Sequence, residues 1–497
     1  DPIFRLKERA GQPASRERVR GTARMVAGFQ PKMVFSPGDS WGKICGQEVR
    51  AHLPIPKVQA PQQREPISVM SKPVTALLAV AGALILVLGL IWFGAGGNHS
   101  TGTPPIDSDH KALAAVDPNG EFVQGIARHW LDAAATPEGF LVTEVNRAWQ
   151  PQPVERTELG AHSRLVYVFA AAYDISRDAA FRNAVHKGAD YMLEHFTDPV
   201  NVAWHASVGR DGKGTGRAGP TAVAQAILAL VNAHRITGDG RYLEAARLAW
   251  TDNLEDLLVL PRMAALEDPE LLTGIKAPPP SSSLLHAFEA LLALHDATGD
   301  DEVWRDAEAI ARFAFKQLAG NSGGFVAARY DASFQPLDLD DDGGIVIGHQ
   351  FSWAYLVSRA MDRGLSPVFL DAVNNLMDAT LRIAGGGKDG LAARASLDGK
   401  TLVAADGDAA TQAAALRALA HFAAVRGRSG YWQNFSKLRD FVATAIVDPE
   451  NEGWLPRRRE SLKLTETEPA KSEGGALGFH AAALYAELAR LQGLRQP

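Results

Sequence analysis

Six polar side chains precede apolar, Ala- and Leu-rich runs at nearly constant intervals. They are separated by 61, 61, 63, 63 and 68 residues and are Arg164, Gln225, His286, His349, Gln412 and His480. Histidine titrates near neutral pH, so it can take a proton from carbon or return one. Arginine can hold the oxygen of a developing enolate. The set indicates proton abstraction next to a carbonyl, as in sugar epimerisation or aldose–ketose isomerisation.

A carboxylate follows the third of these residues by one helical turn. Glu289 lies three positions after His286 and on the same helical face. It could assist the opening of a sugar ring or hold a hydroxyl. It could equally be a buried carboxylate paired with Arg164 or with a histidine, and the sequence leaves both readings open.

A second set of helical segments alternates with the first. Its recurring aromatic residues are spaced by 61, 62, 65 and 62 positions and are Phe181, Tyr242, Trp304, Phe369 and Tyr431. Turn-forming residues at 237–240 and 298–301 join the two sets. A period of 60–65 residues with two helices per unit predicts stacked helical hairpins.

Six copies of one hairpin favour closure into a ring, so we expect an all-α (α/α)6 barrel with the nearly charge-free helices inside. An open solenoid would need polar terminal repeats, but the helix that follows His480 is as apolar as the others. In a closed ring the six polar side chains would face one cavity. Glycine-rich pieces at 138–140, 323–325 and 452–454 are expected to form short strands at one rim.

The N-terminal part has a different composition from the rest. Residues 1–73 mix Arg, Pro, Gln and Gly without apolar periodicity and are expected to be a disordered cytoplasmic segment. Because Met70 precedes an apolar run, residues 1–69 could instead be an upstream extension of the natural protein. Residues 74–93 carry no charge and are long enough to span a bilayer. A linker at 94–118 then leads into a barrel domain at 119–497.

Charges around the apolar segment predict its orientation. Arg64 and Lys72 precede it, whereas acidic residues outnumber Lys111 in the thirty residues that follow. Positive residues stay in the cytoplasm, so we expect a single-pass, bacterial-type inner-membrane protein whose main domain is periplasmic. A cleaved signal peptide is the alternative, but the run is long for one and Trp92 suits an interfacial anchor.

Composition excludes several classes of function. Residues 1–73 hold 13 Lys and Arg against 6 Asp and Glu, which leaves 38 against 51 for the remainder of the chain. An acidic main body argues against nucleic acid as a partner. Cys45 is the only cysteine, so the main body has no cysteine nucleophile. We expect no cofactor and no metal; the Asp-rich stretch 338–343 starts like a calcium loop but has His349 at its twelfth position.

Four motifs in this order resemble those of the N-acylglucosamine 2-epimerase superfamily, which includes cellobiose 2-epimerases and mannose isomerases. They are Ser-Arg-Leu-Val-Tyr at 163–167, His-Ala-Phe-Glu-Ala at 286–290, Gly-His-Gln-Phe-Ser-Trp-Ala at 348–354 and Phe-His at 479–480. The resemblance spans roughly residues 120–490 and implies an (α/α)6 barrel.

The resemblance also implies roles for individual residues. His349 and His480 would be the acid/base pair, Arg164 the ligand of the carbonyl or enediolate oxygen, and His286 a helper in substrate binding and ring opening. The rest of the expected substrate-binding set is Glu289, Gln225, Gln412 and Trp353.

The chain departs from the family pattern beside the central histidine. Ser352 stands where the family has glutamate, and Ala414 replaces the glutamate of the fifth motif. Ser282 and Leu284 replace an asparagine and a second histidine before His286. A carboxylate beside His349 would orient the imidazole and raise its basicity. Because this carboxylate is absent, the protein could act on a different substrate, catalyse a different reaction or lack catalytic activity, and the sequence leaves these three possibilities open.

Two other classes of function therefore remain as alternatives. A glycoside hydrolase or lyase on the same barrel needs two carboxylates in the cavity, for which Glu289, Asp406 and Asp408 are the candidates. A non-catalytic carbohydrate-binding subunit of an envelope polysaccharide system would explain the missing carboxylates. The partners we expect are a mono- or oligosaccharide, the lipid bilayer through 74–93 and that envelope machinery.

Overall fold

The computed structural model describes residues 109–198, 203–254, 258–259, 261–262, 277–385, 390–403, 407–459, 471 and 475–493. The expected disordered segment, the expected membrane anchor at 74–93 and most of the expected linker lie outside these residues. Inside the linker range, Asp109–Ala114 forms helix α2. None of the helices in the described ranges combines the length and the apolar character needed to cross a bilayer.

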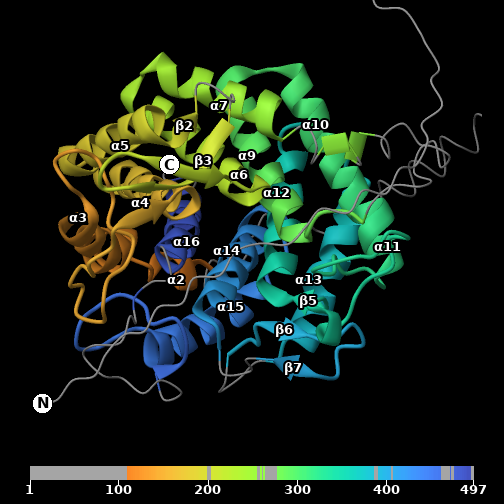
Figure 1. Ribbon diagram of the computed structural model, residues 1–497. Helices are drawn as coiled ribbons and strands as arrows, with labels where there is room; N and C mark the ends of the chain where they lie inside the picture. The colour runs from red at the N-terminus through yellow and green to blue at the C-terminus, as the bar shows by residue number, and fades with distance from the viewer. Residues whose placement is uncertain are drawn as a thin grey trace, which may run out of the picture. The chain divides into compact units, whose positions relative to one another are not determined.

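Six helices form the inner ring of the described body. Each packs against the next along the chain, and the last packs back against the first, which closes the ring. In Figure 1 the colour passes around this ring from orange through green to blue. The inner helices are α4 (Leu159–Ser176), α6 (Pro220–Thr237), α9 (Ser281–Thr298), α12 (Ile347–Met361), α14 (Ala409–Val425) and α16 (Ala476–Gly493).

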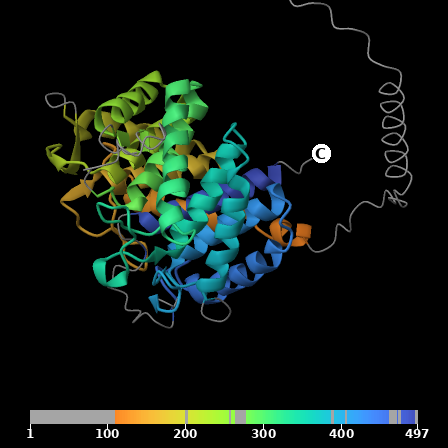
Figure 2. The same ribbon diagram turned by 90° about the vertical axis from the view of Figure 1, so that its right-hand side faces the viewer.

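An outer layer of helices alternates with the inner ring along the chain. Its members are η1 (Asn119–Ala127), α3 (Arg128–Ala134), α5 (Ala179–Tyr191), η2 (Met192–Phe196), α7 (Gly240–Asn253), α10 (Asp301–Arg312), η4 (Phe313–Leu318), α11 (Ala319–Asn321), α13 (Phe369–Ile383), α15 (Tyr431–Phe441) and η6 (Val442–Ile446). The short α2 packs on α15 and α16, so the first described element lies against the last ones (Figure 2). The description of a mostly helical ring of hairpins is thus confirmed for the residues that the structure describes.

The turns between inner and outer helices form for local reasons that the sequence shows. Gly238 and Gly299 end α6 and α9 in the left-handed region, with φ of 79° and 64°, which glycine adopts without strain. Asp239 and Asp300 then cap α7 and α10, because their carboxylates accept from backbone N–H groups of the first turn. Each Gly-Asp pair therefore stops one helix and starts the next.

The inner helices are apolar on nearly every side because each contacts two ring neighbours and the outer layer. In α14 fourteen of the seventeen residues are buried, and small alanines let the backbones approach closely. Larger aromatic groups fill the wider gaps, as where Phe288 of α9 stacks on Trp353 of α12 with ring centroids 5.9 Å apart. Polar side chains inside this ring are few, so those that occur report on function.

The inner helices run parallel to one another. Arg164 of α4 bonds Gln225 of α6 near the start of both helices, and Arg235 bonds Asp174 near the end of both. The same holds for Ser358 and His421, which join the last halves of α12 and α14. The ring therefore has two distinct ends, one formed by helix N-termini and one by helix C-termini.

Short strands precede several inner helices. One sheet has the order β1 (Arg156–Glu158), β3 (Ala203–Gly209), β2 (Thr197–Asp198), with β4 (Gly214–Arg217) also paired to β3; the other contains β5 (Ile345–Val346), β6 (Arg394–Ala395) and β7 (Leu402–Val403). All described pairs are antiparallel. Since β1, β4 and β5 run directly into α4, α6 and α12, the strands lie at the N-terminal end of the ring.

The three glycine-rich pieces do not supply these strands. Residues 138–140 and 323–325 form turns beside isolated bridges, Ala135 to Leu141 and Tyr330 to Pro336, and Trp454 makes a single bridge to Val447. Their glycines adopt positive φ, 92° at Gly139 and 98° at Gly324. This backbone conformation suits a tight turn and interrupts a strand, which is why the expectation of strands there is wrong.

Candidate active site

His286, in the second turn of α9, is in contact with a carboxylate and an aromatic ring. Its Nδ1 lies 3.9 Å from Glu289 Oε2, and its ring stands edge-on to Phe479 of α16 at 6.5 Å. The His286 side chain keeps 18% of its surface accessible, so it lies deep in the ring yet faces open space. Burial, together with the positive charges of Arg164 and Arg417, lowers the pKa of His286 to about 4.

The two histidines of the expected acid/base pair come from α12 and α16, on either side of α14. Burial, followed by the nearby His286, lowers the pKa of His349 to about 4. Burial also lowers the pKa of His480 to about 3, and the positive groups that act on it include His286, Arg417, His349 and Arg164. Arg164, His286, His349 and His480 all occupy the first two turns of parallel inner helices, so these side chains lie at the N-terminal end of the ring, where their charges act on one another. All three imidazoles are neutral at pH 7 and able to accept a proton.

Arg164 is positioned by its neighbour in the ring. Its Nη1 donates to Gln225 Oε1 at 3.0 Å, and Gln225 is itself buried. A Cβ on Gly160 would lie 2.7 Å from that amide oxygen, so the glycine makes room for the contact. Burial lowers the pKa of Arg164 to about 10, opposed by the charge of Glu158, and the guanidinium stays charged at pH 7. We call Arg164, Gln225, His286, His349 and His480 the histidine layer.

Glu289 bounds the histidine layer on the side that faces the C-terminal end of the ring. Besides the contact with His286, its Oε1 accepts from Arg417 Nη1 of α14 at 3.3 Å. Both side chains are close to nine-tenths buried. The second of the two readings of Glu289, as a paired buried carboxylate, describes these contacts, with Arg417 as a partner that the sequence did not indicate.

Gln412 does not lie with the histidines. It is fully buried; its Oε1 accepts from Leu391 N at 3.0 Å, and its Nε2 donates to Leu391 O and Asp408 O, each at 2.8 Å. Gln350 binds Val326 N and O in the same way. The true counterpart of Gln412 in α12 is thus Gln350, and the residue in register with His349 is Thr411. The expected role of Gln412 in substrate binding is therefore corrected: its amide holds a loop.

Trp353 also has a packing position. Its side chain is fully buried, stacked on Phe288 and edge-on to Phe315 at 6.4 Å. The indole fills the gap between α9, α12 and η4 and does not line open space. The expectation that Trp353 contacts substrate is corrected for this reason; the tryptophan instead packs α12 against α9 and η4.

His349 lacks a hydrogen-bonding carboxylate on its own helix, where the family motif has a glutamate. His349 Nδ1 is buried and has no hydrogen-bond partner in the described part of the chain, and Ser352 is buried nearby on the same helix. A different carboxylate, Asp408, acts on His349 and favours its protonated form. Asp408 caps α14 by accepting from Thr411 N and Oγ1. Its position directly before an apolar helix signalled a cap in the sequence, but nothing there linked it to His349.

The carboxylates needed for glycoside hydrolysis do not form a free pair in the described residues. Glu289 is held by Arg417 and Asp408 by the start of α14, while Asp406 lies outside the described residues. The described residues contain no cluster of three or more metal-ligating side chains. The arrangement at the histidine layer is thus a set of neutral bases next to a fixed cation.

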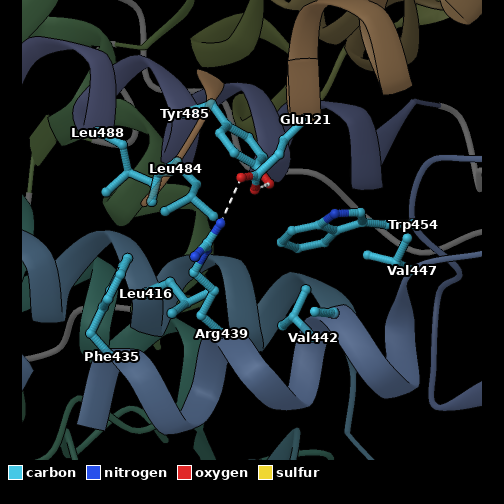
Figure 3. Close-up of a pocket in the computed structure, with 12 residues that line it drawn as sticks. Glu121, Leu416, Phe435, Arg439, Val442, Val447, Trp454, Leu484, Tyr485 and Leu488 are labelled. Atoms are coloured by element: carbon cyan, nitrogen blue, oxygen red, sulfur yellow. Dashed lines mark hydrogen bonds and ion pairs between the residues drawn. The ribbon is translucent and has the colours of Figure 1, made fainter. Parts of the chain in front are cut away.

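A separate hollow of about 210 Å³ lies between η1, α15, η6 and α16, beside the first described helices (Figure 3). Its walls are apolar, with Trp454, Val442, Leu416 and Phe435 among them. Its polar groups bind one another: Glu121 accepts from Arg439 at 2.6 Å and from Tyr485 at 2.9 Å. This hollow contains no free acid or base, so it offers no site for the proton transfers considered above.

A family model for N-acylglucosamine 2-epimerase (GlcNAc 2-epimerase) matches residues 139–474. Among solved structures, a D-mannose isomerase is similar at a TM-score of 0.65 with 20% identity, over 78% of this chain and 99% of that one. A cellobiose 2-epimerase from Spirochaeta thermophila is similar at 0.65 with 18% identity, over 79% and 100%. A family 76 glycoside hydrolase from a bovine Bacteroides thetaiotaomicron strain is more distant, at 0.52 with 10% identity, over 76% and 79%. These solved structures establish likeness of fold.

Proposed function

Because the chain belongs to the N-acylglucosamine 2-epimerase family, we propose that it is a sugar 2-epimerase or aldose–ketose isomerase that works by proton transfer between histidines and carbon. The observation that carries this proposal is the position of three histidines and Arg164 in the first two turns of parallel inner helices, where burial lowers the pKa of each imidazole. Neutral imidazole is the form that removes a proton, and a fixed guanidinium is the group that holds an enediolate oxygen.

In the proposed reaction one histidine of the His349 and His480 pair removes the proton from C2 of the open-chain sugar. The electrons of the broken C–H bond move into the carbonyl and produce an enediolate whose oxygen is held by Arg164. The other histidine takes a proton from solvent while the negative enediolate lies beside it and returns that proton to the opposite face of C2 for epimerisation. For isomerisation a proton goes to C1, and the C2 oxygen loses its proton as the carbonyl forms at C2. The negative enediolate favours an imidazolium beside it, which offsets the lowered pKa values of the empty site. His286 and Glu289, one turn apart, would assist ring opening.

Solvent isotope incorporation tests this function. The protein would be incubated in D2O with mannose, glucose, N-acetylglucosamine and cellobiose, and each sugar analysed by NMR and mass spectrometry. We expect deuterium at C2 of at least one sugar, together with its epimer or ketose. Release of new reducing ends from a glycan without exchange at C2 would favour the hydrolase instead.

One observation favours a second candidate, a non-catalytic sugar-binding protein. His349 Nδ1 has no partner in the described residues, and serine replaces the family's glutamate beside it, so the base lacks the group that would orient it. Calorimetric binding of a sugar from the panel, with no exchange at C2 over days, would establish this candidate and exclude the enzyme.

We further propose that the protein is anchored by residues 74–93 with the barrel on the periplasmic side. The support is the uncharged run and the excess of positive residues before it. Membrane fractionation of native cells followed by protease treatment of spheroplasts tests this. Recovery of the barrel in the membrane fraction and its digestion in spheroplasts are expected; a protease-resistant barrel in intact spheroplasts would contradict the orientation.

A further inference from the structure

A second chamber lies at the C-terminal end of the ring, on the far side of Glu289 from the histidines. It has a volume of about 320 Å³, within the size range of small-ligand sites. Its charged lining comes from five of the six inner helices and from the segment after α12. The charged residues are Arg235, Arg359, Arg363, Arg417 and Arg490 with the carboxylates Glu289, Asp296 and Glu487. We call this the arginine chamber.

The arginine chamber carries an excess of positive charge. Five arginines and three carboxylates line it, and a fourth carboxylate, Asp174, binds Arg235 from outside the lining, which leaves an excess of one positive charge. One carboxylate serves two arginines: Glu487 accepts from Arg490 at 2.5 and 2.7 Å and from Arg359 at 3.2 Å. Tyr355 donates to the same carboxylate, and His421 Nδ1 lies 2.9 Å from it. Glu487 therefore cannot neutralise both arginines, and its acceptor capacity is fully used.

Arg417 at the floor of the chamber is the least satisfied of these cations. Its side chain is 9% exposed, its guanidinium lies over the Tyr355 ring at 4.3 Å, and its hydrogen bond to Glu289 is long, at 3.3 Å. Its Nε is buried and makes no hydrogen bond within the described residues. An arginine has five donors, and a buried charge with unused donors costs free energy unless a ligand fills them.

The chamber is also accessible from outside. The exposed fraction of its charged side chains falls from 48% at Arg235 and Asp296 to 22% at Arg359 and 9% at Arg417. A small ligand can therefore enter past a half-exposed rim and reach a nearly buried cation at the floor. This decrease in exposed fraction from the rim to the floor is typical of a pocket, whereas the side chains of a surface ion-pair network would all be exposed.

We propose that the arginine chamber binds one small ligand through a phosphate or carboxylate group, with Arg417 at the floor and Arg359 and Arg490 at the sides. Arginine matches the oxygens of both groups with two parallel hydrogen bonds. Entry of such a group neutralises the excess positive charge and supplies acceptors to Arg417. The site is independent of the sugar reaction proposed above and takes a ligand of different charge.

A competing role for the arginines follows from the ends of the helices. Six helix C-termini carry partial negative charge, and cations near the last turn stabilise them. Arg363 does donate to a backbone carbonyl, that of Arg359. This role requires only that the arginines lie near the helix ends, whereas Arg417 lies at the middle of α14, eight residues from either end. Helix-end stabilisation therefore does not account for Arg417.

Calorimetric titration with inorganic phosphate and with glucuronate tests the proposal, at an ionic strength held constant with chloride and with acetamide as the uncharged control. We expect one saturable site per chain for phosphate, glucuronate or both, and none for acetamide. The anion that binds identifies the source of the oxyanion. Arg417→Gln is expected to weaken binding at least tenfold, and Arg235→Gln at the exposed rim about threefold.

The control variant is Arg241→Gln, an exposed arginine of the outer helix α7 that pairs with Asp190 and Asp239. It should leave the affinity unchanged. Because Arg417→Gln could destabilise the ring, thermal unfolding would accompany each titration, and the rim variant Arg235→Gln provides a test that does not disturb the floor. Absence of saturable binding of both anions to the wild type would overturn the proposal. So would equal affinity in the wild type, Arg235→Gln and Arg417→Gln.

Discussion

The two ends of the ring differ in the charge of their buried polar groups. At the N-terminal end the histidine layer holds three neutral imidazoles and one arginine, with few carboxylates nearby. At the C-terminal end, about 15 Å further along helices that rise 1.5 Å per residue, arginines and carboxylates form a continuous network. The boundary between them is the pair of Glu289 and Arg417. The repeated inner helix thus places neutral imidazoles at one end of the ring and paired charges at the other.

Burial has different effects on the pKa values of titratable groups at the two ends of the ring because their partners differ. An isolated imidazole responds to burial by losing its proton, as the lowered pKa of His480 shows. Glu487 is also penalised by burial, but hydrogen bonds from Arg490 and the contact with His421 outweigh this and lower its pKa to about 2. Hydrogen bonds from charged partners thus outweigh burial at Glu487, whereas at His421 burial outweighs the contact with Glu487 and lowers the pKa.

Replacing Arg164 by glutamine should have the largest effect on the histidine layer among the changes that leave the histidines in place. Removal of one preorganised oxyanion ligand costs about 10²–10³ in kcat, and the neutral side chain cannot hold an enediolate. Steady-state kinetics on the sugar that exchanges at C2 measures this. Arg235→Gln, the arginine at the same helix pair but at the other end, is the matched control and should retain kcat. Equal losses in both variants would break the distinction between the two ends.

Replacing Gln412 by alanine should reduce stability and not kcat. The change leaves Leu391 N and O without their buried partners, so a loss of about 2–4 kcal/mol in the free energy of unfolding is expected. Denaturant unfolding measures it. A fall in kcat of a hundredfold with unchanged stability would instead restore Gln412 to the substrate site.

Replacing Ser352 by glutamate tests whether a carboxylate at this position increases the activity of His349. If Ser352 stands where the family's glutamate orients the histidine, Ser352→Glu should raise kcat about tenfold, with Ser352→Gln as the uncharged control. Because Ser352 is buried, thermal unfolding must show that the variant folds. An increase with glutamine as large as with glutamate would contradict an effect of the carboxylate charge.

The smallest expected effect is on the pH dependence of stability. The folded-state pKa values of His286, His349 and His480 lie below the ordinary value of 6.5, so the unfolded chain binds more protons between pH 6.5 and about 4. Stability should therefore fall as the pH drops through this window. Replacing His286 by glutamine should flatten the fall by a few degrees in Tm. An unchanged slope in His286→Gln would contradict burial as the cause.

The closed ring of hairpins could be predicted from the sequence because both helices of each hairpin recur with a constant period. The sequence also placed Arg164, His286, His349 and His480 correctly at one end, since side chains at equal positions of parallel helices meet. The error at Gln412 is a slip of one residue: in an Ala-rich helix the apolar pattern fixes the register only to within a residue, and the loop contact made by Gln350 decides it. The packing role of Trp353 depends on the size of the gap between α9 and α12, which no periodicity reveals.

The arginine chamber has a partial signal in the same repeat. Ten residues after each of the six polar residues that open the repeats stand Asp174, Arg235, Asp296, Arg359, Phe422 and Arg490. The first four are charges of alternating sign in the second half of the inner helices. Charge at the end of a helix is common on surfaces, so the alternation by itself indicates only ion pairs. The convergence on one cavity and the buried Arg417 appear only when the ring is closed.

The most direct test of the account compares histidines from the two ends of the ring. His349→Ala, His480→Ala and His421→Ala would be assayed for deuterium incorporation at the sugar C2 in D2O, after thermal unfolding has shown that each variant folds. His421 is fully buried, whereas the other two are partly exposed, and it binds Ser358 and Glu487 in the C-terminal half. We predict loss of exchange by at least about 10²-fold in the first two variants and wild-type exchange in the third. Full exchange in both His349→Ala and His480→Ala would contradict the two-histidine mechanism.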